Sequence, residues 1–336
     1  MGIDTATANF LCAAKSSGVD FERTLTLGRQ CLYPWLLDSL ALQKIFDCLG
    51  NGLRADEFLR QNWYADPFFL ELGAHTVDSM DVSSYESPTM IHDLNMPMPT
   101  QWKQRFSVVF DGGTIEHVFN IPQALKNSMQ MVRIGGHFLS SNMANNCMGH
   151  GFWQLSPELM FRVFSRDNGF LIKAVLLHEV SPRGRWYVVS DPDEIRSRVE
   201  LCNSRPTLIL TIAQRVADCE IFSTPPMQSD YVALWKESQQ TVSPVSPDPK
   251  GAQAGLGIDL RHFVPSFLKR PLRSARYRAC AAYESLGKII KSAVSKPTVV
   301  RAASFNQNCY RAISEYDLIR GNFSPAPPSR VRAFQA

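Results

Sequence analysis

The stretch of sequence that decides the fold is FSVVFDGGTIEHVFNIPQALKNSMQMVRIGGHF, residues 106–138. It begins with a short β-rich run, residues 107–110, that ends on Asp111. The glycine pair 112–113 follows directly, and glycine lets the backbone leave a strand in conformations that a side chain would forbid. This pattern predicts a strand that ends in an acidic residue and a turn.

A helix and a second strand are predicted after this turn. Pro122 suits the first turn of a helix, and apolar residues then recur at near-helical spacing as far as Val132. The glycine pair 135–136 supplies a stop, after which Phe138 and Leu139 re-enter a sheet. The stretch is therefore predicted to form one half of an open α/β sheet, in which ligands bind at the carboxyl ends of the strands.

The same stretch resembles the central part of class I S-adenosylmethionine-dependent methyltransferases. In that family a fourth strand ends in an acidic or polar turn, an LEHV-like sequence and a helix follow, and L-x-P-G-G precedes the fifth strand. Residues 111–118, DGGTIEHV, and 132–136, VRIGG, carry the resemblance here. It implies a Rossmann-like α/β fold with a mostly parallel seven-stranded sheet and helices on both faces, and S-adenosylmethionine as the cofactor.

Neighbouring segments fit the same plan, so that the resemblance covers residues 21–216. An apolar run that closes on Gly28 stands where the family places its first strand and cofactor loop. Residues 76–81 and 89–94 are predicted to be the second and third strands, and residues 207–213 are apolar enough for a buried last strand.

The resemblance implies which acidic residues bind the cofactor. Asp81, at the end of the second strand, would accept hydrogen bonds from both ribose hydroxyls, as the acid of dinucleotide folds does. Asp93 would accept from the adenine amine while Leu94 packs on the ring. In the alternative interpretation, Asp81 caps the turn at residues 83–84 and Asp93 has a plain turn role before Asn95.

The first loop departs from the family pattern. Where the family usually shows E/D-x-G-x-G-x-G, this chain has a single glycine, Gly28, followed by the long cation Arg29. Two interpretations of Arg29 stay open, namely a bidentate pair with the carboxylate of the cofactor's methionine part and an obstruction of the pocket. Asp111, at the end of the fourth strand, completes the set of predicted cofactor-binding residues.

Glu116, His117 and His150 are the predicted catalytic residues. Methyl transfer from a sulfonium is a direct displacement, so the protein must align the nucleophile and remove any proton of high pKa. Either histidine could act as the base, and His117 could instead be an ordinary packing or helix-capping residue. Glu116 and His117 could also bind a divalent cation, but two ligands without a visible third do not predict a metal site.

Residues 140–158 are unusually rich in asparagine, glycine, histidine and aromatic residues. A loop that offers amides and an indole can hydrogen-bond and stack a substrate. Asn145, Asn146, Phe152 and Trp153 are therefore the predicted acceptor-binding residues. In the alternative interpretation, the asparagines make turns while the aromatic residues fill the core.

Composition divides the chain into three parts. Residues 1–237 are predicted to form the methyltransferase-like domain, the Ser/Pro/Gly-rich residues 238–257 a linker, and residues 258–336 a basic, mainly helical extension. Between residues 261 and 301 there are ten basic residues and one acidic residue. Such a segment suits an anionic partner such as nucleic acid or a membrane surface, or it is a solvated appendage of the core.

The remaining composition is that of an ordinary globular protein, with 45% hydrophobic and 20% charged residues among 336. The sequence shows neither a secretory leader nor an apolar run near the ~20 residues of a membrane helix, so a cytoplasmic location is expected. The eight cysteines include no C-x-x-C pair and are expected to be reduced.

The sequence thus predicts methyl transfer from S-adenosylmethionine to an oxygen or nitrogen of a small molecule or glycan-like metabolite. Two alternatives stay open. In the first, a degenerate member keeps the fold and acts as a binding or scaffold protein. In the second, a nucleic-acid-associated methyltransferase uses the basic segment.

Overall fold

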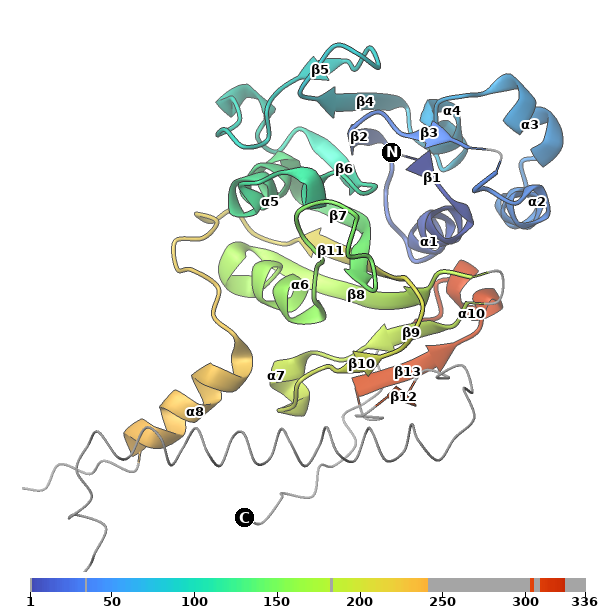
Figure 1. Cartoon of the computed structure of the whole chain (residues 1–336). Coiled ribbons are helices and arrows are strands. Elements are labelled where there is room, and N and C mark those ends of the chain that lie inside the picture. Colours follow the sequence, from blue (N-terminus) through green and yellow to red (C-terminus); the bar gives the residue numbers. More distant parts are fainter. Residues whose placement is uncertain (1, 34, 182–183, 241–302, 305–308, 324–336) are drawn as a thin grey trace, which may run out of the picture.

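The computed structural model describes residues 2–33, 35–181, 184–240, 303–304 and 309–323. Their centre is a nine-stranded sheet with the strand order β13-β9-β8-β11-β7-β6-β2-β4-β5 (Figure 1). In that order the strands are Tyr310–Ile313, Trp186–Val189, Phe170–Glu179, Thr207–Arg215, Val132–Asn145, Phe106–Asp111, Arg23–Leu27, Thr76–Asp81 and Met90–Ile91. Two short pairs lie outside this sheet: β1 (Gly2–Ile3) with β3 (Cys31–Leu32), and β10 (Leu201–Cys202) with β12 (Ala303–Ser304).

The sheet is parallel from β5 to β7, and every neighbouring pair beyond β7 is antiparallel. β2 pairs in parallel with β4 and β6, and β6 pairs in parallel with β7. β11 is inserted antiparallel between β7 and β8. Strands β5 to β8 form the mostly parallel seven-stranded sheet of the class I methyltransferase fold, so the predicted fold class is confirmed.

Helices cover both faces of the sheet. The helices of the described residues are α1 (Thr5–Ser16), α2 (Ser39–Leu49), α3 (Ala55–Gln61), α4 (Asp66–Glu71), α5 (Ile121–Met131), α6 (Pro157–Val163), α7 (Pro192–Ile195), α8 (Ser229–Gln240), which lies away from the sheet, and α10 (Glu315–Ile319), with single 3₁₀ turns η1 (Thr100–Trp102), η2 (Ile115–His117) and η3 (Arg166–Asn168). Alternation along β6 sends Val108 and Phe110 into the core under α1–α4 and Val109 into the core under α5 and α6. Both faces of the sheet are therefore buried.

The sequence predicts that the glycine pair 135–136 stops the helix. In the structure it does not. Helix α5 already ends at Met131, and the glycines lie inside β7. The register between β6 and β7 shifts there, and Gly135 has φ +81°. A Cβ on Gly136 would lie 2.7 Å from the carbonyl oxygen of Ser107. Glycine is thus required by a bulge and a close backbone approach.

Part of the predicted C-terminal extension packs on the main sheet. β13 pairs antiparallel with β9 at the edge of the main sheet, and Leu318, Ile319 and Phe323 are buried in the same core as α1. Residues 310–323 therefore complete the first domain. The predicted linker, except for its start in α8, and the basic residues 261–301 lie outside the described residues.

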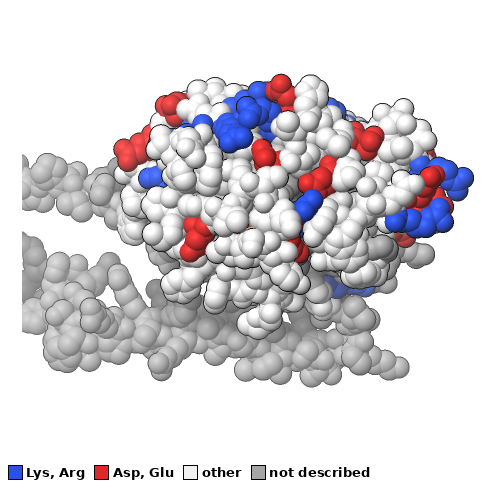
Figure 2. All heavy atoms as spheres, turned by 90° about the horizontal axis from the view of Figure 1, so that it is seen from above, with Lys and Arg blue, Asp and Glu red and all other residues white. Residues whose placement is uncertain are grey.

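The charged surface is mixed. Seen from above the view of Figure 1, Lys and Arg side chains alternate with Asp and Glu side chains over a face that is otherwise uncharged (Figure 2). This face of the described residues therefore offers a polyanion no continuous basic surface. Among the described helices, each is too short or too polar to cross a membrane.

Removing residues 310–323 should unfold the domain. Burying a large apolar side chain contributes about 1.5–3 kcal/mol, so the loss of Leu318, Ile319 and Phe323 should cost about 5 kcal/mol or more. We expect a chain that ends at residue 323 to melt like the full chain and one that ends at residue 309 to melt far lower or to be insoluble. Equal melting temperatures in thermal denaturation would contradict the role of β13 and α10.

His137 should make the domain sensitive to acid. It is buried on β7, and burial, with a smaller effect of Lys173 opposed by Asp20, lowers its pKa from 6.5 to about 4. Between these pH values the unfolded state binds the proton more readily, so the free energy of unfolding falls by about 1.4 kcal/mol per pH unit as the pH drops below 6.5. Above pH 6.5 the residue has no such effect.

The measurement is urea unfolding between pH 7.5 and 4.5. His137→Leu should lose less stability with falling pH than the natural chain. The exposed His75, changed to Leu, is the matched control and should follow the natural chain. Parallel pH profiles for all three proteins would show that His137 is not the residue responsible.

Candidate active site

Three neighbouring strands end together at the carboxyl edge of the sheet. In the register, Leu27 of β2 lies beside Met80 of β4 on one side and beside Asp111 of β6 on the other. Gly28 then leaves the strand with φ +66°, and its N–H donates to the carbonyl of Met80 at 2.6 Å. Gly28, Asp81 and Asp111 are thus brought to one edge, as the sequence predicted.

Arg29 is held by the protein itself. Its guanidinium lies 3.8 Å from the centre of the Tyr64 ring, and Nη1 donates to the carbonyl oxygens of Glu86 and Ser87 at 3.1 and 3.2 Å. Its Nε lies 3.5 Å from a carboxylate oxygen of Asp66. A cofactor carboxylate would have to compete with these contacts, and both interpretations of Arg29, the pair with that carboxylate and the obstruction of the pocket, stay predictions.

Gln30 is a site residue that the sequence analysis missed. Its buried amide Nε2 donates to the carbonyl of Leu27 at 2.9 Å. A Cβ on Gly112 would lie only 2.5 Å from Gln30 Oε1, so glycine at position 112 makes room for this side chain. Gln30 thereby fills the gap between the ends of β2 and β6. The signal in the sequence is the first glycine of the pair 112–113, which leaves room for a side chain as well as forming a turn.

The acid at the end of β4 and the acid after β5 have local partners. Asp81 is half-buried, and its Oδ1 accepts from the backbone N–H of Ser83 at 3.0 Å. Asp93 Oδ1 accepts from the backbone N–H of Asn95 at 2.9 Å, a hydrogen bond that lowers the pKa of Asp93. Leu94 is buried in the core under α5. Both acids therefore accept hydrogen bonds from turn residues, as their alternative interpretation predicts. Cofactor binding by Asp81, Asp93 and Leu94 stays a prediction.

Two buried acids share one amide at the end of β6. Asn142 Nδ2 donates to Asp111 Oδ2 at 2.7 Å and to Glu116 Oε2 at 2.6 Å. Asp111 Oδ1 also accepts from the backbone N–H groups of Thr114 and Ile115, which fixes the start of η2. Burial, and then the charge of Glu116, raise the pKa of Asp111 to about 7, and burial also raises the pKa of Glu116.

The structure brings His150 to the two catalytic candidates on η2. The ring centres of His117 and His150 are 4.9 Å apart, and His150 Nε2 lies 3.5 Å from Glu116 Oε1. Burial, with a smaller effect of His150, lowers the pKa of His117. All three predicted catalytic side chains therefore form one cluster, next to Asp111 at the carboxyl edge.

A glycine makes this arrangement possible. Gly151 has φ +69°, and a Cβ on it would lie 2.8 Å from the carbonyl oxygen of Glu116. That same carbonyl accepts from the backbone N–H groups of Phe152 and Trp153 at 2.8 and 3.2 Å. The loop after β7 therefore folds back onto η2 and carries His150 with it.

Aromatic side chains lie beside the cluster. Phe152 is 68% exposed and meets the exposed Phe119 edge to face, with ring centres 5.9 Å apart. Trp153 Nε1 donates to the carbonyl of Val118 at 3.0 Å, which fixes the indole next to η2. The predicted acceptor-binding residues Phe152 and Trp153 thus accompany the catalytic candidates.

Asn145 and Asn146 have structural partners instead. Asn145 Nδ2 donates to Asn203 Oδ1, and Asn146 Nδ2 donates to Asn203 Oδ1 and to the carbonyl of Arg205. Both amides therefore hold the segment before β11, and acceptor binding by them stays a prediction. Asn142, three residues earlier, is the asparagine that contacts the acids. Strand alternation from Ser140, the register partner of Asp111, could have found it.

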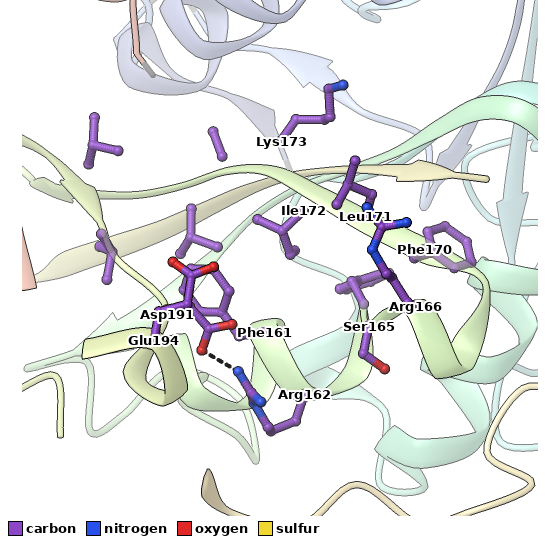
Figure 3. Close-up of a pocket in the computed structure, with 15 residues that line it drawn as sticks. Phe161, Arg162, Ser165, Arg166, Phe170, Leu171, Ile172, Lys173, Asp191 and Glu194 are labelled. Carbon is purple, nitrogen blue, oxygen red and sulfur yellow. Dashed lines mark hydrogen bonds and ion pairs between the residues drawn. The ribbon is translucent and has the colours of Figure 1, made fainter. Parts of the chain in front are cut away.

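A cavity lies at the opposite edge of the sheet, where the amino ends of the parallel strands meet. A cavity of about 280 Å³ lies between α6, α7 and the first half of β8, with Arg162, Lys173, Asp191 and Glu194 around it (Figure 3). Arg162 contacts Asp191 in this cavity. Ligands of open α/β sheets bind at the carboxyl ends of the strands, so this cavity lies at the edge opposite the candidate cofactor site.

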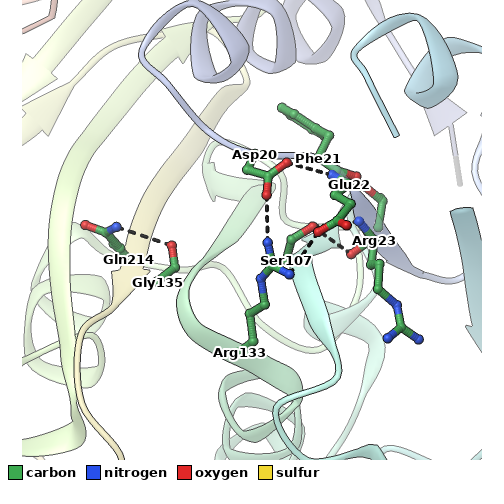
Figure 4. A network of polar contacts seen from close by, with 9 residues as sticks. Asp20, Phe21, Glu22, Arg23, Ser107, Arg133, Gly135 and Gln214 are labelled. Atoms are coloured by element: carbon green, nitrogen blue, oxygen red, sulfur yellow. Dashed lines mark hydrogen bonds and ion pairs between the residues drawn. The ribbon is translucent and has the colours of Figure 1, made fainter. Parts of the chain in front are cut away.

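A network of ion pairs and hydrogen bonds connects the strand starts at the amino edge. Arg133 Nη2 donates to Asp20 at 2.7 Å and Nη1 to Glu22 at 2.9 Å, while Ser107 Oγ accepts from the backbone N–H of Arg23 at 2.7 Å (Figure 4). These contacts join the segment before β2 to the starts of β6 and β7. They hold the strands together at the edge away from the candidate site.

The strand order defines the class of protein, a class I methyltransferase-like fold. The sequence of this chain matches no protein-family model and no curated protein. Several solved structures align with it at low identity. An S-adenosylmethionine-dependent methyltransferase from Mesorhizobium loti is 16% identical, with 61% of this chain and 95% of that chain covered and a TM-score of 0.30.

Two further structures align in the same way. The trans-methyltransferase CalH, in complex with SAH, is 12% identical over 63% of this chain and 55% of that chain, with a TM-score of 0.32. The branched-chain polyamine synthase from Thermus thermophilus, in complex with N4-aminopropylspermidine and 5′-methylthioadenosine, is 14% identical over 65% and 58%, with a TM-score of 0.33. At these scores the fold class rests on the strand order of the sheet.

Gly151→Ala should displace the loop that carries His150. The added Cβ meets backbone rather than a flexible side chain, and left-handed φ costs a non-glycine residue about 1–2 kcal/mol. We expect a lower melting temperature. Gly149→Ala is the matched control, because a Cβ there has no neighbour within 4 Å and its φ is not left-handed. If both variants melt like the natural chain, the close approach of Gly151 to Glu116 is not formed.

Proposed function

We propose that the protein transfers a methyl group from S-adenosylmethionine to an oxygen or nitrogen of a small molecule or glycan-like metabolite. The observation that carries this proposal is the meeting of a glycine turn, three acids and two histidines at one carboxyl edge of a class I methyltransferase fold. Fold alone fits many activities, so the proposal depends on this site.

The cofactor half of the proposal uses the ends of β2 and β4. Gly28 turns directly beside Asp81, because its N–H bonds to Met80. A carboxylate there can accept from both hydroxyls of a ribose. Both hydrogen bonds from Ser83 end on Asp81 Oδ1, so ribose binding through Oδ2 is compatible with the turn.

The acceptor half uses η2 and the loop after β7. Glu116, His117 and His150 lie next to Asp111, at the strand end where an acceptor meets the cofactor's methyl group. The exposed rings of Phe119 and Phe152 offer an apolar wall on which the face of a sugar or another small ring can pack. This wall is the observation that supports the proposal of a small-molecule or glycan-like acceptor.

The proposed methyl transfer needs no covalent bond between the protein and the methyl group. S-adenosylmethionine, when bound, supplies a methyl group on a positively charged sulfur, which leaves as a neutral thioether. The protein must hold the acceptor's nucleophilic atom in line and take its proton. The Glu116, His117 and His150 cluster would bind the acceptor group and govern that proton.

One observation favours the scaffold alternative. Gln30 fills the gap between β2 and β6, and Arg29 is held by Tyr64 and the β4–β5 connection, so the first loop is more closed than a three-glycine loop would be. The nucleic-acid alternative depends on residues 261–301, which lie outside the described residues. Ligand binding separates the proposed activity from the scaffold.

Asp81→Asn should weaken binding of S-adenosylhomocysteine by about 1.5–3 kcal/mol, the scale of hydrogen bonds to a charged group. Asparagine keeps an Oδ1 for the Ser83 turn but removes the charge and the second acceptor oxygen. Isothermal calorimetry on the full chain gives the dissociation constants. Melting temperatures show whether the variant is folded.

Asp78→Asn is the control, because Asp78 lies within β4 rather than at its end. If Asp78→Asn loses binding and Asp81→Asn does not, the ribose-binding residue has been wrongly assigned. If the natural chain shows neither heat nor a thermal shift with millimolar S-adenosylhomocysteine, the scaffold alternative takes the place of the proposal.

A further inference from the structure

We propose that Glu116, His117 and His150 bind a divalent cation of the zinc type. Each residue offers one ligand atom, and these atoms lie within 4.8 Å of one another. Zinc binds nitrogen and oxygen at about 2.0–2.2 Å, so two ligand atoms of a tetrahedral site lie about 3.4 Å apart. Glu116 Oε1 and His150 Nε2 are already 3.5 Å apart.

A buried oxygen without a hydrogen bond points independently to a ligand at this place. The Glu116 side chain is 1% exposed, and its Oε2 accepts from Asn142. Its Oε1 has no hydrogen-bond partner among the described residues. A buried carboxylate oxygen without a hydrogen bond is costly, and a cation between it and the imidazoles would satisfy it.

The surroundings hold the ligands in the way that metal sites require. Asn142 donates to Glu116 Oε2 and so orients the carboxylate, and groups that fix a ligand's orientation strengthen metal binding. The close approach of Gly151 to the Glu116 carbonyl sets the place of His150. His117 is exposed, so its ring is free to rotate toward the other two ligands.

The ligand set selects the kind of cation. Two imidazole nitrogens and one carboxylate oxygen suit zinc and similar transition metals, whereas magnesium and calcium prefer oxygen ligands alone. Three protein ligands leave a fourth position open, as in catalytic zinc sites. That open position would take the acceptor's oxygen or nitrogen and lower the pKa of its proton; this use rests on the proposed function, and the binding of the cation does not.

The test uses the full chain after treatment with a chelator. Calorimetric titration with zinc should show one ion per chain, and His117→Ala and His150→Ala should each weaken binding at least tenfold. His75→Ala is the control, because His75 is an exposed histidine outside the cluster, and it should bind as the natural chain does. No binding, or equal binding by all four proteins, would overturn the inference.

Cobalt distinguishes this site from the thiols. Cys48, Cys202 and Cys219 are exposed and form no disulfide, and thiolates also bind zinc. Cobalt held by two imidazoles and a carboxylate should show visible absorption bands without a thiolate charge-transfer band in the near ultraviolet, and His150→Ala should lose the visible bands. A thiolate band that persists in His150→Ala would assign the ion to cysteine and contradict the site.

Failure of this inference differs from failure of the proposed function. The cobalt spectrum is recorded without S-adenosylmethionine, and the calorimetry with S-adenosylhomocysteine is done on chelator-treated protein. Cobalt binding at the cluster without nucleoside binding would support the metal site and contradict the proposed methyltransferase function. Nucleoside binding without cobalt binding would support the proposed function and contradict the metal site.

Discussion

The hydrogen bonds of one carboxamide keep two acids together inside the protein. Asn142 bridges Asp111 and Glu116, which are removed from water and would repel each other if both were charged. A carboxamide has two N–H donors, so it can satisfy one oxygen of each acid. Asp111 then binds the N–H groups of Thr114 and Ile115, and this turn sets where η2 begins. The position of the candidate active site follows from this bridge.

Much of the fold was readable from local patterns, because alternation and turn residues act over a few positions. The strand ending at Asp111 and the strand predicted at residues 76–81 are β6 and β4. The third predicted strand shortens to Met90–Ile91. The glycines 135–136 predict a helix stop but form a bulge, because both features use the same residue type and only the contact with Ser107 tells them apart.

The site was less predictable, because it depends on contacts between distant parts of the chain. His117 and His150 meet only because Gly151 lets a loop lie against the carbonyl of Glu116. From sequence, Glu116 and His117 had no visible third partner. The nearby asparagines show the same difficulty, since Asn142 faces the acids whereas Asn145 reaches Asn203.

The pairing of β13 with β9 has a consequence for synthesis of the chain. β9 ends at Val189, but its partner on the outer side begins at Tyr310. While the ribosome adds the intervening residues, that side of β9 has unpaired N–H and C=O groups, which can pair with strands of other chains. The newly made domain is therefore open to aggregation during the interval between these two strands, when chaperones that cover exposed strand edges would protect it.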